Sequence, residues 1–505
     1  MLVATTYKST VKQINQDVLL GCIFYLIPLI QFDMKIKLYL LRITAGLLVI
    51  ASFAMCAKQT LKVDNLPATT PSSTAAADTS GKTTDSVKMP VNTALPITTC
   101  SYTVQASQWM VDGTSIAPGS VICIPAGTRG ALLFKNLKGT ADKPIIIVNK
   151  GGKVNFLTSK TASYAFKTQN CQYFKITGNG ASGINYGFIV DGGNIGMTMD
   201  DLSSDFEISN VQVRNSGFAG IMAKTDPSCD IKTQRGHFTM KNVSIHDNYV
   251  HDTGGEGLYI GNSFYATGVS TSCGTALPHD VVNLKVYNNT TEQTGCEGIQ
   301  VGGAVSGCEV YNNIVKTPGI KPFASAQNNG IQLGEGTGGK CYNNLVKDAP
   351  GNGIIVLGLG DNLVFNNFII RASGHGIFAD SRYTPGPNFA FINNTIVSPA
   401  MSGIRLNSTS IPMNTAINNV IINPGSGQYI SKMNSSVKLT SLNNYQGGDV
   451  SECAFVNFAG DDFHLQGKSP LINAGANVLS YGIVSDYYKK LRPSGLSYDI
   501  GATEY

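Results

Sequence analysis

Two short motifs recur in phase along this chain and constrain its fold more than any other feature. The first is a glycine followed by isoleucine or leucine, at Gly220-Ile221, Gly257-Leu258, Gly298-Ile299, Gly330-Ile331, Gly353-Ile354, Gly376-Ile377 and Gly403-Ile404. The second is a polar pair, at Asp247-Asn248, Asn288-Asn289, Asn312-Asn313, Asn343-Asn344, Asn366-Asn367, Asn393-Asn394, Asn418-Asn419 and Asn443-Asn444. Successive glycines lie 23 to 41 residues apart. Repeats of this length indicate a solenoid.

The segments between the motifs predict short β-strands. Apolar and polar residues alternate in 283–287, 307–311 and 361–365, and Gly, Pro, Asn or Ser lies at their ends. A repeat of 23 residues holds two or three such strands with their turns, which fits one coil of a parallel β-helix and is too short for a propeller blade. Less regular turns precede the repeats, so we expect an all-β solenoid of roughly a dozen coils.

Each motif has a structural interpretation within such a coil. Asparagine tolerates the left-handed backbone of a sharp turn, and its amide can bond to the amide stacked above it in the next coil. The glycine permits a tight bend that leads into a strand. The isoleucine that follows then points inward and forms an aliphatic stack.

The N-terminal part of the chain predicts export. Residues 34–55 begin Met34-Lys-Ile-Lys and continue with an apolar run that ends just before Cys56, as in a bacterial lipoprotein signal peptide. Residues 1–33 are then an overlong gene start, and residues 56–98, rich in Thr, Ser, Ala and Pro, form a tether. The alternative, a membrane segment at 19–32, is shorter than the ~20 residues that a span requires.

These features lead us to expect lipidation of Cys56 and anchoring to the bacterial outer membrane or cell surface, with secretion as the alternative. The chain carries a formal charge of +5, and residues 1–55 hold five Lys or Arg against two Asp or Glu. The small remaining charge argues against a nucleic-acid partner. We expect a monomer. In an exported protein, Cys100 with Cys123 and Cys229 with Cys273 are the candidate disulfides.

The two ends of residues 97–505 resemble a known family. The motifs are Ala117-Pro-Gly-Ser-Val-Ile-Cys123 near the start, and Arg492-Pro493 followed by Asp499-Ile-Gly-Ala502 near the end. They resemble secreted bacterial right-handed parallel β-helix proteins of the pectin-lyase-like superfamily, which contain PbH1 repeats. The resemblance implies one β-helix domain over residues 99–505, closed by a final Asp-Ile-Gly-Ala strand. It also implies a carbohydrate-active protein, because many such proteins are lyases, hydrolases or epimerases of acidic polysaccharides.

Stacking the coils on their glycines places several polar residues on one outer face. Glu256 and Glu297 precede successive glycines, so their carboxylates should lie about 5 Å apart. That repulsion needs a cation, a basic neighbour or a retained proton. We expect the two glutamates to bind Ca²⁺, and Lys224 to abstract a proton beside Glu256.

Two insertions, at 225–236 and 262–279, flank these coils and predict the walls of a binding groove. His251 with Asp252, in the turn before Glu256, is a further candidate base and its orienting group. The expected substrate-binding residues follow or precede the glycines of successive coils: Tyr259, Gln300, Gln332, His375 and Arg405.

The leading functional prediction is a polysaccharide lyase that cleaves a uronate-containing glycan by β-elimination. That reaction needs neutralisation of the uronate carboxylate and a base for the C5 proton. The alternatives are a non-catalytic glycan-binding or adhesive surface lipoprotein, and a glycoside hydrolase or uronate epimerase.

Overall fold

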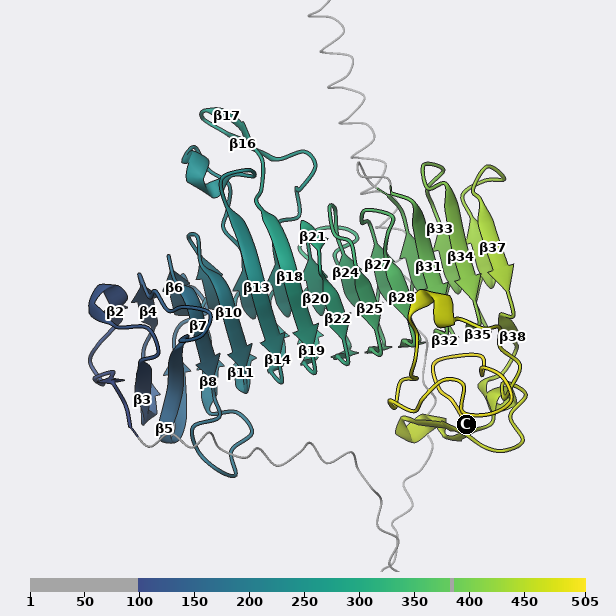
Figure 1. Cartoon of the computed structure of the whole chain (residues 1–505), viewed down its shortest axis with the longest axis horizontal. Helices are drawn as coiled ribbons and strands as arrows, with labels where there is room; N and C mark the ends of the chain where they lie inside the picture. The colour runs from purple at the N-terminus through teal and green to yellow at the C-terminus, as the bar shows by residue number, and fades with distance from the viewer. Residues whose placement is uncertain (1–98, 382–385) are drawn as a thin grey trace, which may run out of the picture. The chain divides into compact units, whose positions relative to one another are not determined.

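Parallel strands stacked coil upon coil form the body of the protein (Figure 1). The computed structural model describes residues 99–381 and 386–505; the signal peptide and tether predicted within 1–98 lie outside the described residues. The strands form a 12-stranded sheet and a 24-stranded sheet, with two small hairpins besides. The 12-stranded sheet contributes one strand to each coil, which confirms the predicted parallel β-helix of about a dozen coils.

Each coil contributes to three faces. Face 1 is the 12-stranded sheet, which consists of β2 (Met110–Asp112), β4 (Leu132–Lys135), β6 (Tyr164–Gln169), β9 (Ile195–Asp200), β12 (Ile221–Ala223), β15 (Leu258–Ile260), β20 (Ile299–Val301), β24 (Ile331–Leu333), β27 (Ile354–Val356), β30 (Ile377–Ala379), β33 (Ile404–Leu406) and β36 (Ile430–Lys432). The Gly-Ile motif opens seven of these strands, from β12 to β33.

Faces 2 and 3 are the two halves of the 24-stranded sheet and meet at the asparagine turns. Face 2 holds β7 (Gln172–Thr177), β10 (Ser204–Ser209), β13 (Thr239–His246), β18 (Asp280–Tyr287), β21 (Ala304–Ser306), β22 (Glu309–Tyr311), β25 (Lys340–Tyr342), β28 (Leu363–Phe365), β31 (Asn388–Ile392), β34 (Met413–Ile417) and β37 (Leu439–Leu442). Face 3 holds β8 (Phe188–Asp191), β11 (Val211–Arg214), β14 (Tyr249–Thr253), β19 (Thr290–Thr294), β23 (Ile314–Lys316), β26 (Leu345–Lys347), β29 (Phe368–Ile370), β32 (Thr395–Val397), β35 (Val420–Ile422) and β38 (Tyr445–Gly447).

Three longer or terminal strands complete this sheet: β1 (Tyr102–Thr103), β3 (Val121–Arg129) and β5 (Ile145–Leu157), of which β5 pairs with both β7 and β8. The hairpins are β16 (Val269–Thr271) with β17 (Gly274–Ala276), and β39 (Phe455–Asn457) with β40 (Asp462–Leu465). Short 3₁₀ helices lie at η1 (Gly113–Ser115), η2 (Ile231–Thr233), η3 (Val450–Cys453), η4 (Phe458–Gly460) and η5 (Leu479–Tyr481). Within the described residues, no helix has the length and apolarity that a bilayer crossing requires.

The asparagine pairs behave as predicted. The first residue of each of the eight pairs has a left-handed φ between 47° and 55°. The second residue stacks in a buried ladder, in which the side-chain amide of Asn289 donates to Asn313 and that of Asn313 donates to Asn344, both at 3.0 Å. The ladder runs from Asn248 to Asn444 and fixes the turn between faces 2 and 3.

The Gly-Ile motif also behaves as predicted, with one addition. The isoleucine or leucine after each of the seven glycines is fully buried in the core. The glycine lies at the bend before the strand, but none of the seven has a left-handed φ. A Cβ on Gly298 would lie 2.4 Å from the Val315 side chain and 2.7 Å from the Thr291 hydroxyl. Glycine is therefore required because neighbouring coils approach too closely for a side chain.

The C-terminal segment corrects one expectation. Residues 499–502 form no strand and add no final coil. Instead, the segment after β38 packs against the outside of faces 2 and 3 (Figure 1): Val478 and Ile483 lie against face 2, and on face 3 Phe463 stacks on Phe368 at 4.0 Å. Buried Arg492 forms an ion pair of 2.6 Å with Glu504. The Arg-Pro and Asp-Ile-Gly-Ala motifs thus cover the flank of the solenoid.

Both predicted disulfides are present, Cys100–Cys123 near the first coil and Cys229–Cys273 between the two predicted insertions. The described residues also include five buried free cysteines, at positions 171, 296, 308, 341 and 453.

Candidate functional site

Three loops surround the outer side of face 1 at coils β12 to β24. Tyr259, Gln300 and Gln332 lie side by side there, because β15, β20 and β24 pair in register through these residues. Two of the loops are the predicted insertions at 225–236 and 262–279. The third, residues 317–328, was missed. The sequence feature that could have revealed this loop is the spacing of 32 residues between Gly298 and Gly330, which exceeds the shortest spacing of 23 between successive motif glycines.

Polar residues of the two predicted insertions anchor those loops. The guanidinium of Arg235 lies 3.6 Å from the centroid of the Tyr265 ring, and the Tyr265 hydroxyl donates to Asp280 at 3.0 Å. His279 is fully buried and accepts from the backbone N–H of Thr225 at 3.1 Å. These residues are therefore occupied in holding the loops against the solenoid.

The loop at 317–328 covers the turns that carry the two glutamates. The backbone N–H of Gly319 donates to the carbonyl of Cys296 at 2.8 Å, and that of Lys321 donates to Gly295 at 3.1 Å. Phe323 packs on Phe218, with ring centroids 5.7 Å apart. Glu256 and Glu297 consequently have exposures of 1% and 0%.

A cavity of about 210 Å³ opens between loops 262–279 and 317–328. Its polar lining includes Ser263, Gln300, Gln327, Gln332 and Glu335. The Ser263 hydroxyl is 2.8 Å from the Tyr259 hydroxyl and accepts from the Gln300 amide at 2.7 Å. The cavity is smaller than the ~300–1,000 Å³ typical of drug-sized ligands. Its size fits one small polar unit at a time.

Lys224 lies next to Tyr259, whose hydroxyl is hydrogen-bonded to Ser263 in the cavity wall. Its ammonium forms an ion pair of 2.6 Å with Asp226 and lies 4.7 Å from the centroid of the Tyr259 ring. Burial opposes the charge, but attraction to Tyr259, Asp226 and Glu256 outweighs it and raises the pKa of Lys224. A lysine held protonated in this way is unsuited to the predicted role in proton abstraction and suited to binding an anion.

Glu256 and Glu297 are as close as predicted and also adjoin a thiol. One ligand atom from each of Glu256, Cys296 and Glu297 lies within 4.8 Å of the other two. The Oε2 atoms of both glutamates are buried without a hydrogen-bond partner. Burial raises the pKa of Glu256. Burial, with repulsion from Glu256 adding to it, raises the pKa of Glu297 to about 7. Burial also raises the pKa of Cys296 to about 12.

The glutamates lie at one end of a second polar ladder. The Asn329 amide donates to Oε1 of Glu297 at 2.9 Å, and the Asn352 amide donates to Asn329 at 2.9 Å. The backbone N–H of His375 donates to Asn352 at 3.0 Å, and Nδ1 of His375 accepts from Ser402 at 3.2 Å. Burial, then the charge of Arg405, lowers the pKa of His375. His375, predicted to bind substrate, thus has one ring nitrogen engaged within the scaffold.

The donor set around the glutamates does not fit the predicted Ca²⁺. Calcium takes 6–8 oxygen ligands. The pair offers four carboxylate oxygens, of which Oε1 of Glu297 already accepts from Asn329, and the third member of the cluster is the thiol of Cys296. No catalytic step is therefore assigned to calcium at this site.

Two other predicted residues lie away from the cavity. His251 belongs to β14 on face 3, where Nδ1 is 2.6 Å from Asp252 and Nε2 is 2.9 Å from Gln212. Its strand neighbours are Arg214 and Glu292, so its partners lie on another face. Arg405 is on face 1, but four strands beyond Gln300, or about 19 Å at the usual strand spacing.

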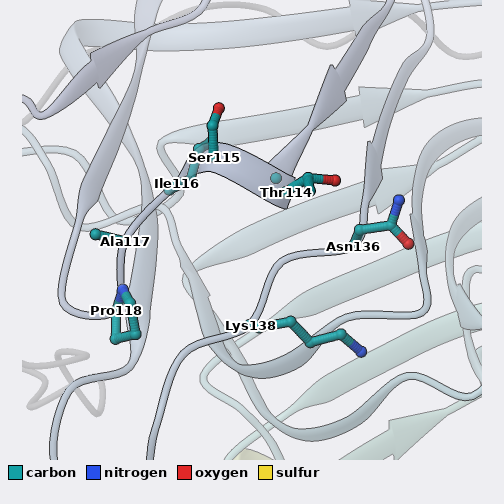
Figure 2. Close-up of a pocket in the computed structure, with 8 residues that line it drawn as sticks. Thr114, Ser115, Ile116, Ala117, Pro118, Asn136 and Lys138 are labelled. Atoms are coloured by element: carbon teal, nitrogen blue, oxygen red, sulfur yellow. The ribbon is translucent and has the colours of Figure 1, made fainter.

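A larger hollow, of about 530 Å³, lies near the N-terminal coils. Figure 2 shows that Thr114, Asn136 and Lys138 on its rim do not point toward a common centre. Its lining holds no carboxylate and no histidine. The face 1 cavity is therefore the better candidate for chemistry.

A family model described as "Right handed beta helix region" matches residues 282–446. This match and the stacked parallel strands identify the fold as a right-handed parallel β-helix. No curated protein matches the sequence.

Several solved structures are similar at low identity. The A-module of a mannuronan C-5 epimerase from Azotobacter vinelandii is 13% identical over 65% of this chain and 87% of that chain, with a TM-score of 0.42. An alginate lyase from Paenibacillus sp. is 15% identical over 64% and 93%, with a TM-score of 0.37. The GH136 lacto-N-biosidase from Eubacterium ramulus is 12% identical over 66% and 63%, with a TM-score of 0.43.

Proposed function

We propose that this protein is a polysaccharide lyase that cleaves a uronate-containing glycan by β-elimination in the face 1 cavity. The observation that carries the proposal is the charged Lys224, which lies 4.7 Å from the ring centroid of Tyr259, whose hydroxyl is hydrogen-bonded to Ser263 in the wall of the amide-lined cavity. We further propose that the protein is exported and anchored through Cys56, which would bring it to extracellular polysaccharide.

Lys224 is assigned to the uronate carboxylate. Its ammonium neutralises that carboxylate, and neutralisation makes the C5 proton more acidic. This role replaces the proton abstraction predicted from the sequence. Glu256 is a positioning residue, because its charge helps to keep Lys224 protonated.

Tyr259 is assigned to the proton transfers. Its hydroxyl is hydrogen-bonded with Ser263, whose own hydroxyl accepts from Gln300 in the cavity wall. The Tyr259 oxygen takes the C5 proton and passes its own proton to the bridging oxygen; the electron pair released at C5 forms the C4–C5 double bond, and the bond from C4 to the bridging oxygen breaks. Gln300 and Gln332 bind sugar hydroxyls.

A second candidate function, glycan binding without cleavage, is favoured by the amides of Gln300, Gln327 and Gln332 that line the cavity. Amides bind sugar hydroxyls but do not transfer protons at neutral pH. A glycoside hydrolase is not favoured, because the two close carboxylates are buried under loop 317–328.

The test is incubation of the purified protein with pectate, alginate and glycosaminoglycans, with and without Ca²⁺. A lyase generates unsaturated uronates, whose conjugated double bond absorbs in the ultraviolet. If absorbance rises with none of these polymers, the lyase proposal fails. Retention on affinity gels of the same polymers would then support glycan binding.

A further inference from the structure

We infer that Glu256, Cys296 and Glu297 form a binding site for a thiophilic divalent transition metal, with Zn²⁺ as the best fit. The site would clamp the turns of two successive coils beneath loop 317–328. It shares Glu256 with the proposed lyase site, where that residue only supports Lys224, and neither Lys224 nor Tyr259 is a ligand.

The first support is geometric. The three ligand atoms lie within 4.8 Å of one another. Zinc binds carboxylate oxygen at ~2.0–2.2 Å and thiolate sulfur at ~2.3 Å, so tetrahedral ligands are about 3.3–3.8 Å apart. Side-chain movements of about 1 Å or less would bring the three ligand atoms to that spacing.

The second support is independent of the clustering. The Oε2 atoms of Glu256 and Glu297 are buried and have no hydrogen-bond partner. An unpartnered buried carboxylate oxygen is costly, and buried charges are normally paired or coordinate a metal. Lys224 does not satisfy these atoms, because its ammonium is paired with Asp226 at 2.6 Å.

The chemistry of the donors selects the metal. A thiolate favours zinc and similar ions over calcium or magnesium, which prefer oxygen. On binding, the cation would displace the thiol proton, and a divalent charge would offset most of the repulsion among the two carboxylates and the thiolate. Since Glu256 belongs to one coil and Cys296 and Glu297 to the next, the bound ion would join the two coils at the point that loop 317–328 covers.

The inference can be tested on the purified protein after treatment with a chelator. Equilibrium dialysis against Zn²⁺ alone should give close to one ion per chain, and dialysis against Ca²⁺ should give none at this site. Co²⁺ should produce a thiolate-to-metal charge-transfer absorbance. Zn²⁺ should also raise the unfolding temperature by a few degrees, since it binds only the folded state.

Variants locate the site. Cys296→Ser should abolish the charge-transfer absorbance and the Zn²⁺-dependent rise in unfolding temperature. Cys308→Ser, at another buried free cysteine, is the matched control and should retain both. Glu297→Gln provides a second variant, expected to lose at least tenfold in Zn²⁺ affinity. Absence of Zn²⁺ binding in the wild type would overturn the inference, and so would unchanged binding in Cys296→Ser or Glu297→Gln. None of these outcomes depends on lyase activity.

Discussion

Replacing Glu297 with glutamine should make the protein more stable above neutral pH. The carboxyl is fully buried, and its pKa is raised from 4.5 to about 7. Between these two values the folded state binds more protons than the unfolded state, so stability falls as pH rises through this window. The loss begins above pH 4.5 and is complete above pH 7. Glutamine occupies nearly the same volume and carries no charge, so the variant should lack this loss.

The magnitude follows from the shift. A rise of about 2.5 units corresponds to at most ~3.4 kcal/mol, at ~1.36 kcal/mol per unit. A folded region of roughly 400 residues has an unfolding entropy of ~0.8 kcal/mol per degree, so the expected change is about 4 °C in unfolding temperature. The remaining carboxylate, Glu256, can accept a hydrogen bond from the new amide, which adds to the gain.

The assay is thermal unfolding of both proteins at pH 5 and pH 8 with a chelator present, so that no metal contributes. From pH 5 to pH 8, the wild type should lose up to about 4 °C relative to Glu297→Gln. Glu309→Gln on face 2, whose carboxylate accepts from the Tyr342 hydroxyl at 3.1 Å, is the control and should follow the wild type. If the unfolding temperature of Glu297→Gln equals that of the wild type at both pH 5 and pH 8, ionisation of the buried Glu297 does not destabilise the folded state, and the reasoning is refuted.

Three further predictions concern the scaffold. Gly298→Ala should lower the free energy of unfolding, measured in urea, by about 1–3 kcal/mol, because its Cβ would clash with Val315. Gly130→Ala is the control: open space surrounds Gly130, so its free energy of unfolding should change little. Asn313→Ala should cost about 3–5 kcal/mol, because the backbone N–H of Asn289 loses its side-chain acceptor and the carbonyl of Val286 loses its side-chain donor in the buried ladder; a cost below 1 kcal/mol would contradict a stabilising role for the ladder. At His246, burial opposes the charge, but hydrogen bonds to Asp247 and Glu207 outweigh it and raise the pKa to about 9. The charged imidazole therefore contributes fully to the stability of the folded state below pH 6.5, and this contribution is lost as pH rises through 9. His246→Gln should therefore cost up to ~3 kcal/mol at pH 6 and little at pH 10, and an equal cost at both values would exclude this electrostatic role.

The repeat itself was predictable because each coil repeats the same physical requirements. Every turn between faces 2 and 3 needs a left-handed residue followed by a buried amide, and both appear in the sequence as the asparagine pairs. From β12 to β33, every entry to face 1 needs a residue without a side chain, and that residue appears as the glycine before isoleucine or leucine. The asparagine turn and the glycine before face 1 recur at the same two positions of successive coils, and together they set the register in which those coils pair.

The site was only partly predictable, because loops that cover a face are not periodic. The sequence placed Glu256, Glu297 and Lys224 on neighbouring coils correctly, but it could not show that loop 317–328 buries the glutamates. Cys296 directly precedes Glu297 in the chain, but the repeat pattern did not single out its thiol as a third member of the cluster. The pairing of Lys224 with Asp226 depends on how the insertion folds, and that pairing changed the role assigned to Lys224.

The proposed C-terminal closure failed for a related reason. The Arg-Pro and Asp-Ile-Gly-Ala motifs mark a segment correctly but do not say which surface it covers. Apolar side chains on the outside of face 3, such as Phe368 and Val397, provide that surface. They are indistinguishable by pattern from inward-facing residues of the same strands.

The most direct test of the proposed function compares Lys224→Met with Lys232→Met, a variant of an exposed lysine in the neighbouring insertion. The measurement is the initial rise in ultraviolet absorbance with each uronate polysaccharide. We expect the wild type and Lys232→Met to form unsaturated product from at least one polymer, and Lys224→Met to form it at least a hundredfold more slowly with a similar unfolding temperature. Full activity in Lys224→Met, or no product from the wild type with any polymer, would contradict the proposed lyase site.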